Sequence, residues 1–316
     1  MHSIALRTWL RRLVRLAISL AAVLTLSFLM LQLIPGDPVR LALGPDATAE
    51  LVAERRTQLG LDQPILIQYF RYWGGVLTGN LGNSIITGQP VALIVASRIG
   101  NTAVLVVVSL VATMTLAIAI GVSVGISTHS GRRPTLRFAF NSLTGLVGAL
   151  PEFLTAVLLV YVFAVSLRLL PVAGAKGPSS FVLPATAIAL GSIATLARIV
   201  RSSTAAVLDE DYILVARSKR LPRRRIYLRH ALPNLLTAAL TLGGLQIGAI
   251  VTGTIVAENV FAIPGIGTAL VNALTSRDYP VAQILMLIFA SAVLVLNVLV
   301  DVLLSIVNPR SAIKET

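Results

Sequence analysis

The residue types that perform chemistry in proteins are sparse in this chain. It has no cysteine and only three histidines, His2, His129 and His230, which fall at the N-terminus and in two predicted loops. The lack of cysteine excludes disulfides, thiolate metal sites and a cysteine nucleophile. The three histidines are too scattered to predict a metal site or a catalytic base.

Nucleotide hydrolysis is equally unsupported. An ATPase needs a Gly-x4-Gly-Lys-Ser/Thr loop whose backbone amides cradle the phosphates. The lysines of this chain stand at positions 176, 219 and 314, and none lies in such a loop. A membrane-embedded enzyme would need a nucleophile with a base, or a metal cluster, and remains a remote alternative. The sequence therefore predicts a chain without catalytic residues.

The most informative polar stretch runs from Asp209 to Pro233, between two apolar segments. Nine of the 26 basic residues lie between Arg198 and Arg229, and three acids, at 209–211, come before most of these bases. Acids favour the first turn of a helix and bases the last, because of the helix dipole. This order predicts a short amphipathic helix from Asp209 to Leu221, outside the bilayer and offered to a soluble partner. An ordinary basic loop that only fixes topology is the alternative.

Composition predicts a polytopic membrane protein. The chain is 56% hydrophobic and only 12% charged, with a mean hydropathy of +0.86, whereas soluble domains carry about 25% charged residues. The net charge of +13 does not indicate nucleic acid, because the basic residues gather at the ends of apolar spans. Six stretches are long and apolar enough to cross a bilayer as helices: residues 13–33, 102–126, 138–166, 181–197, 235–257 and 281–307.

The basic residues also predict the orientation. Eighteen of them fall on the side that holds both termini and eight on the other side, so both termini are expected in the cytoplasm. The largest segment on the opposite side covers residues 35–101. Its aromatic cluster at 69–73 suits a helix at the membrane interface, within a small packed cap.

Glu152, which follows Pro151 within the third span, is the acid most difficult to place. A carboxylate in lipid costs about 2.5–3.5 kcal/mol on insertion scales, so it is expected to face protein or water. Pro151 favours a kink there. One interpretation is a residue that lines a pathway and touches an amine or cation; the others are a pair with a partner subunit or a position nearer the surface. Asn297 and Asp301, four residues apart, are expected to form a structural contact on one helix face.

Several short motifs, in this order and spacing, resemble one known family. They are residues 33–38 (LIPGDP), 59–64 (LGLDQP), 68–69 (QY), 81–82 (LG), 87–91 (TGQPV), 211–212 (DY), 216–219 (ARSK), 229–234 (RHALPN), 258–261 (ENVF), 264–267 (PGIG), 277–281 (RDYPV) and 297–301 (NVLVD). The chain resembles the permease subunits of ATP-binding-cassette importers, and within them the first permease of the oligopeptide, dipeptide and nickel branch. This resemblance covers nearly the whole chain.

The resemblance implies an all-α, type I importer permease in a prokaryotic cytoplasmic (inner) membrane. Residues 1–34 would hold the cytoplasmic N-terminus and first transmembrane helix, 35–101 an extracytoplasmic segment, 102–308 a five-helix core with a cytoplasmic coupling loop at 198–234, and 309–316 a cytoplasmic tail. It also implies as partners a second permease, two ATP-binding subunits that bind ATP and Mg, an extracytoplasmic substrate-binding protein and membrane lipid. No cofactor is expected in this chain.

In this family the 209–221 helix would couple the permease to the ATPase. The expected coupling residues are Asp209, Asp211, Tyr212, Ala216, Arg217, Lys219, Arg220 and Leu221, with Tyr212 and Ala216 at the packed centre. Arg220 stands where the family pattern has glycine, and arginine disfavours the left-handed turn that glycine permits. Either the turn is built differently or the coupling is altered.

The resemblance further suggests an outer gate. The expected residues are Glu258, Asn259, Phe261, Pro264, Gly265 and Gly267, whose Pro-Gly-x-Gly pattern suits a tight re-entrant turn. The expected substrate is a dipeptide or oligopeptide, and nickel or another small solute is the alternative. An ion-coupled carrier acting alone would need paired ionisable residues near the midplane and internal repeats, and only Glu152 qualifies.

Overall fold

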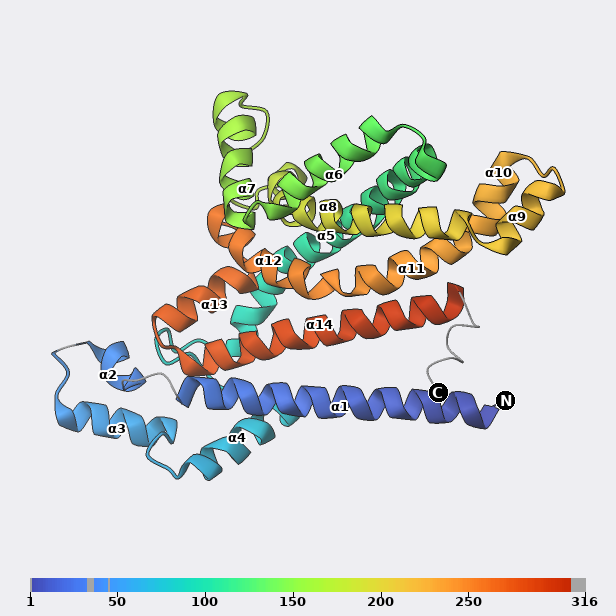
Figure 1. Ribbon diagram of the computed structural model, residues 1–316. Helices are drawn as coiled ribbons and strands as arrows, with labels where there is room; N and C mark the ends of the chain where they lie inside the picture. The colour runs from blue at the N-terminus through green and yellow to red at the C-terminus, as the bar shows by residue number, and fades with distance from the viewer. Residues whose placement is uncertain (1, 33–36, 45, 308–316) are drawn as a thin grey trace. The chain divides into compact units, whose positions relative to one another are not determined.

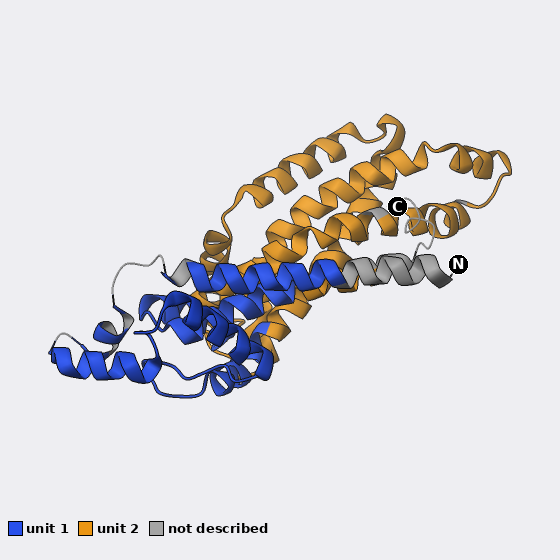
Figure 2. Cartoon of the chain, turned by 90° about the horizontal axis from the view of Figure 1, so that it is seen from below, with its two compact units in different colours: residues 1–102, 264–294 blue, residues 103–263, 295–316 orange. Residues whose placement is uncertain are grey.

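The computed structural model describes residues 2–32, 37–44 and 46–307. In this part of the chain the regular structure is helical, apart from one isolated β-bridge between Asn83 and Pro90 (Figure 1). The chain divides into two compact units (Figure 2), residues 1–102 with 264–294 and residues 103–263 with 295–316. The expected all-α fold is confirmed. The predicted tail at 309–316, and most of the 33–38 motif, fall outside the described residues.

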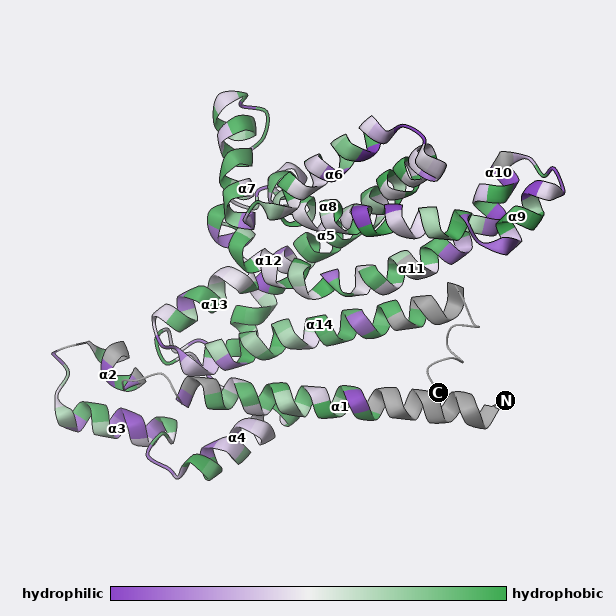
Figure 3. Cartoon of the chain, in the orientation of Figure 1, coloured by the Kyte–Doolittle hydropathy of each residue, from purple (hydrophilic) through white to green (hydrophobic). Residues whose placement is uncertain are grey.

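The helical elements follow one another along the chain. They are α1 (His2–Gln32), α2 (Pro38–Leu43), α3 (Ala49–Leu59), α4 (Ile65–Thr78), α5 (Val91–Thr128), the 3-10 turn η1 (His129–Gly131), α6 (Pro134–Ala149), α7 (Glu152–Leu159), the π-helical η2 (Val160–Ser166), the 3-10 turn η3 (Pro178–Phe181), α8 (Val182–Leu208), α9 (Asp211–Ser218), α10 (Arg223–Arg225), the π-helical η4 (Ile226–Ala231), α11 (Leu232–Gly244), α12 (Gln246–Val260), α13 (Ile266–Thr275) and α14 (Tyr279–Val307). Hydrophobic residues line most of α7 and α14, whereas α3 and α9 carry many hydrophilic ones (Figure 3).

Most predicted spans coincide with a helix or a bent helix pair. Within the described residues, three helical segments are long and apolar enough to cross a membrane alone: Val91–Gly131, Pro178–Leu208 and Tyr279–Val300. The first predicted span corresponds to α1, whose described apolar stretch is Val14–Leu29. With its 38 residues, α5 is about 57 Å long at 1.5 Å per residue, well beyond the roughly 30 Å of the hydrocarbon core. It therefore extends outside the bilayer.

The third predicted span is wrong as a single helix. It is a pair, α6 and the α7–η2 segment, bent by 97°. A residue before proline is pushed out of the helical region, and Leu150 is extended, with φ −70° and ψ 126°. Pro151, also extended, then precedes the first turn of α7. The fifth predicted span is likewise two helices, α11 and α12, joined next to the pair Gly243–Gly244, a common place for a kink.

The predicted charged loop is partly helix. α8 continues to Leu208, so Arg198 and Arg201 lie in that helix rather than in a loop. The predicted 209–221 helix is shorter than expected, because α9 covers only Asp211–Ser218. Asp209 closes α8 instead, since its backbone amide bonds to the Ala206 and Val207 carbonyls.

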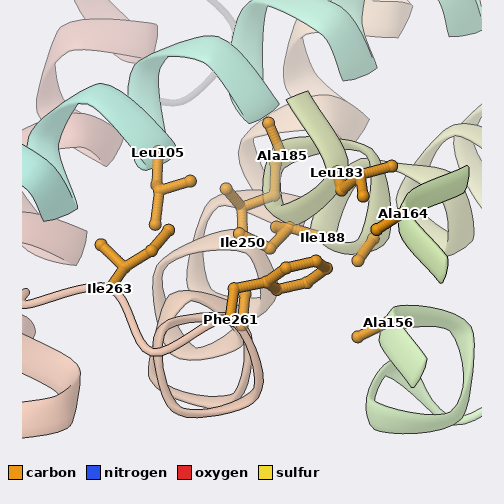
Figure 4. Packing of buried hydrophobic residues seen from close by; sticks show 11 residues of the cluster. Leu105, Ala156, Ala164, Leu183, Ala185, Ile188, Ile250, Phe261 and Ile263 are labelled. Atoms are coloured by element: carbon orange, nitrogen blue, oxygen red, sulfur yellow. The ribbon is translucent and has the colours of Figure 1, made fainter. Parts of the chain in front are cut away.

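The second unit is organised around α8. This helix packs against α6, α7, α11 and α12, and its buried residues include many alanines. Phe261, which is fully buried, lies with its ring beside Ile188 of α8 and Ile250 of α12 (Figure 4). Small residues on α8 let neighbouring helices approach closely, which is how helices associate in lipid.

Two glycines bring α5 against α8. A Cβ built on Gly121 would lie 2.6 Å from Val200 Cβ, and one on Gly125 would lie 2.6 Å from Thr204 Cβ. No real Cβ tolerates such distances, so the two glycines, four residues apart on one helix face, allow this contact.

In the first unit, a buried carboxylate joins the start of α14 to the loop between α4 and α5. Asp278, just before α14, accepts hydrogen bonds from the Ser84 hydroxyl and from the Ile85 amide, at 3.1 Å for the amide. Thr102 accepts a 2.8 Å bond from the Ile266 amide at the start of α13. These bonds satisfy polar groups that would be costly to bury unpaired.

The predicted aromatic cluster packs on α1. The hydroxyl of Tyr69 lies 2.8 Å from the Thr25 hydroxyl, and that of Tyr72 lies 3.0 Å from the Ser27 hydroxyl. Both rings contact Phe28, with centroids 5.4 and 6.0 Å away. Helix α4 is therefore fixed to α1 by its aromatic side chains.

Three helices end with a non-glycine residue in the left-handed conformation: Arg220 after α9 (φ 51°), Ala262 after α12 (φ 49°) and Arg277 after α13 (φ 56°). Each end has the Schellman pattern. After α9, the Arg220 amide bonds to the Arg217 carbonyl at 2.9 Å, and the Leu221 amide to the Ala216 carbonyl at 3.4 Å. The turn that the family builds with glycine is therefore kept, and arginine adopts the strained conformation.

We predict that Gly121→Val destabilises the chain by about 1–3 kcal/mol, because the added side chain would overlap Val200. The midpoint of thermal unfolding in detergent measures this. Gly100→Val is the matched control, because Gly100 is on the same helix and a Cβ there meets nothing within 4 Å. Equal effects of the two substitutions would contradict this account of the α5–α8 contact.

We predict that Arg220→Gly stabilises the chain by about 1 kcal/mol, because glycine adopts the left-handed conformation without the penalty that a Cβ brings. The thermal midpoint should rise. The neighbouring Lys219→Gly is the control, since Lys219 has φ −73° and gains nothing from glycine. A gain as large for Lys219→Gly would show that Arg220 is not strained.

Candidate functional site

The expected site residues fall into three places. The expected coupling residues lie in and around α9, and Pro151 and Glu152 lie at the bend between α6 and α7. The expected gate residues are divided: Glu258, Asn259 and Phe261 belong to the second unit, and Pro264, Gly265 and Gly267 belong to the first.

Helix α9 is positioned by its two ends. Glu210, in an extended conformation, precedes its first turn, and Asp211 lies in that turn. Arg217 lies in the last turn, followed by the exposed Lys219 and Arg220. The predicted order of acids and bases along the helix is therefore present, and it complements the helix dipole.

One face of α9 packs into its own unit. Ile213 and Ala216 are buried with Leu208, Ile226 and Leu235, and Leu221 packs against the same cluster. Ala216 is therefore not exposed to a partner, contrary to its expected place at the centre of a partner contact. The i, i+3 spacing of Ile213 and Ala216 defines the inner face, whereas sequence alone could not say which apolar face points inward.

The opposite face of α9 is exposed and apolar. Leu214 and Val215 are about half exposed, at 47% and 52%, and Tyr212, at the edge of this face because it stands four residues before Ala216, is 39% exposed. The Tyr212 hydroxyl accepts a 2.7 Å hydrogen bond from the Asn234 side chain of α11, which fixes its ring. We call these three side chains, Tyr212, Leu214 and Val215, the α9 face. The exposed cations Lys219 and Arg220 follow directly after α9. Together with α10, this helix lies beyond the ends of α8 and α11 (Figure 1).

Two side chains fix the base of α9. Arg217 donates to the Leu208 carbonyl at 3.3 Å, so it caps the end of α8. His129 Nε2 pairs with Asp209 Oδ1 at 2.8 Å, and Ser130 Oγ lies 2.8 Å from His129 Nδ1. The role of His129 is missing from the sequence prediction, because its partner is 80 positions away and no local pattern links them.

Glu152 lies in the first turn of α7, where the helix dipole favours a carboxylate. It is half-buried, and its Oε1 is buried without a hydrogen-bond partner among the described residues. Gly253 of α12 makes room for it, because a Cβ on Gly253 would lie 2.5 Å from Glu152 Oε2. The carboxylate therefore packs directly on the α12 backbone.

A cavity of about 170 Å³ lies in front of this carboxylate. It is lined from α7, α8 and α12, and from the end of α6. The lining polar side chains are Glu152, Thr155, Ser192, Thr195 and Gln246. We call this cavity the elbow pocket. Its lining carries one ionisable group, Glu152.

The gate residues have mixed surroundings. Glu258 and Phe261 are fully buried and Asn259 is exposed. The Phe261 carbonyl accepts a 2.9 Å bond from the Gly174 amide, which ties the end of α12 to the loop before η3. In the other unit, Gly265 precedes α13 and Gly267 is buried in its first turn. The gate role of these six residues stays a prediction.

No cluster of three or more histidine, cysteine or acidic side chains is present in the described parts of the chain. The predicted contact between Asn297 and Asp301 stays a prediction, because the side chain of Asp301 is outside the described ones. Of the places predicted from the sequence, the α9 face and the elbow pocket are therefore the two that the described residues define within one unit.

Comparison with known proteins places the chain in one family along nearly its whole length. Residues 117–313 match the family model described as "Binding-protein-dependent transport system inner membrane component". Residues 5–105 match the model of the N-terminal part of such membrane components.

Several similar relatives share one name. The chain is 38% identical over 302 residues to the "Glutathione transport system permease protein GsiC" of Salmonella paratyphi A. These 302 residues cover 95% of this chain and 97% of the relative. Proteins of the same name from Salmonella typhimurium and Escherichia coli are each 37% identical over the same length. These matches confirm the expected family and a multi-pass protein of the bacterial inner membrane. The chain belongs to the inner-membrane permease components of binding-protein-dependent transport systems, in the branch that includes peptide importers.

Proposed function

We propose that this chain forms half of the translocation pathway of an importer for short peptides, and that α9 receives the movement of a separate ATPase subunit. The observation that carries the coupling role is the α9 face. It is apolar and exposed on a short helix among cationic side chains, in a loop too charged to enter lipid. Such a face supports docking to a water-soluble protein.

The geometry of α9 supports transmission of force. Its inner face is packed against the ends of α8 and α11 through Ile213, Ala216 and Leu235. The His129–Asp209 pair also joins its base to the turn after α5. A force applied to α9 would therefore reach α5, α8 and α11 of the same unit. Lys219 and Arg220 at the rim suit acidic groups on the partner and would serve specificity more than affinity.

Peptides are favoured as substrates by the relatives, which are named for glutathione transport, and glutathione is a short peptide. No group of metal-ligating side chains favours nickel in the described residues. The second permease, the ATPase and the binding protein are the partners that this function requires.

We predict that Leu214→Asp reduces substrate-stimulated ATPase activity of the assembled complex about tenfold or more, because a charge on an apolar contact would cost at least about 1.4 kcal/mol. Leu228→Asp is the control, since Leu228 is exposed to 52% in the same charged region but outside α9. Leu214→Asp with normal coupling would overturn the docking role of α9.

We predict that proteoliposomes with the complete importer and its cognate binding protein accumulate radiolabelled glutathione or alanyl peptides in an ATP-dependent, saturable way. The control is the same complex with a hydrolysis-deficient ATPase. Accumulation of nickel ions without any peptide accumulation would overturn the proposed substrate class and leave the importer architecture intact.

A further inference from the structure

We infer that the elbow pocket is a binding site for a protonated amine, with Glu152 as the counter-charge and a set of oxygen acceptors around it. This inference rests on the proposed function, because the amine would be that of an imported peptide. The pocket lies wholly within the second unit, between α7, α8 and α12.

The carboxylate is poised for a ligand. Its buried Oε1 has no partner, and no ion pair joins Glu152 to a basic side chain in the described part of the chain. A carboxylate oxygen that is buried without a partner is costly even when the side chain is only half-buried, so it persists where a ligand or function requires it. The first-turn amides of α7 offset only part of this cost.

Two of the other polar groups, the hydroxyls of Thr155 and Thr195, present acceptors. The Thr155 hydroxyl donates to the Pro151 carbonyl at 3.3 Å, and the Thr195 hydroxyl donates to the Gly191 carbonyl at 3.0 Å. With their protons used, both oxygens offer lone pairs to the pocket. An ammonium group has three N–H donors and no acceptor, so one carboxylate and two hydroxyl oxygens match it.

The volume of the elbow pocket and the types of its lining side chains indicate which class of cation it can bind. The volume of about 170 Å³ admits an amine with a small neighbouring group rather than a whole oligopeptide. A transition metal would prefer imidazole or thiolate ligands, and the lining has none. An organic amine at the end of a peptide is therefore the class of ligand that fits.

One small residue sets the position of the carboxylate. Gly253 lets Glu152 lie against α12, because a Cβ there would lie 2.5 Å from Glu152 Oε2. Pro151 is the reason that the carboxylate is at this place, because the 97° bend starts a new helix whose first residue is Glu152. The site is thus built by the break in the helix and by α8 and α12.

The test uses the complete importer in proteoliposomes with trialanine and N-acetyl-trialanine as probes. Loading of the binding protein with each probe is measured separately, and import is expressed per loaded binding protein. We expect the wild type to import trialanine about tenfold or more faster than the acetylated form, in line with a hydrogen bond to a charged group. Glu152→Gln should remove this preference while leaving binding-protein loading unchanged.

Further variants separate ligand binding from structure. Gly253→Ala should displace the carboxylate and also weaken the preference, whereas Glu152→Asp, which keeps the charge, should retain part of it. Glu50→Gln, on the exposed first turn of α3, is the control and should behave as the wild type. If Glu152→Gln fails to assemble, Glu152→Asp and Gly253→Ala provide the test. The amine site is overturned if both variants prefer trialanine over N-acetyl-trialanine as strongly as the wild type does.

The outcomes distinguish this inference from the proposed function. If the wild type imports neither peptide, the proposed substrate class is wrong and the amine site falls with it. If the wild type imports both and Glu152→Gln slows them equally, the carboxylate pairs with a group of the complex and the amine site alone is overturned.

Discussion

Close packing of helices through small side chains is the constraint on which the second unit depends. In lipid the hydrophobic effect does not drive one helix onto another, so helices associate through van der Waals contact and hydrogen bonds. The alanines of α8 and the two glycines of α5 provide this contact. Because α8 also packs against α6, α7, α11 and α12, it sets the positions of both the elbow pocket and α9.

The polar features lie where helices are interrupted. Pro151 starts a new helix and brings Glu152 to its first turn, and the left-handed residues 220 and 262 end α9 and α12. Interrupted backbone is tolerated at membrane depth where protein or water satisfies the freed groups. The strain at such ends costs stability, and it persists because the surrounding contacts fix these turns.

The structure changes the expected role of individual residues in α9. Ala216 packs inward with Ile213, and Arg217 caps α8. The exposed apolar residues are Leu214 and Val215. The proposed coupling surface is therefore the other face of the same helix. A partner that docks there would meet a surface held rigid by the packed side.

The sequence by itself determined the all-α membrane class, the family and most spans, because long apolar stretches and charge placement are local properties of the chain. It also indicated a kink at Pro151, but it left open how the turn at Arg220 is built, which the structure shows to be left-handed. It did not determine the 97° bend, because the direction in which a chain leaves a proline depends on what it packs against.

Only the tertiary structure decided which face of α9 is buried, that His129 pairs with Asp209, and that Gly253 makes room for Glu152. These contacts join residues far apart in the chain, such as Glu152 and Gly253. Their distances follow from how the helices pack around α8, and no spacing along the sequence encodes them.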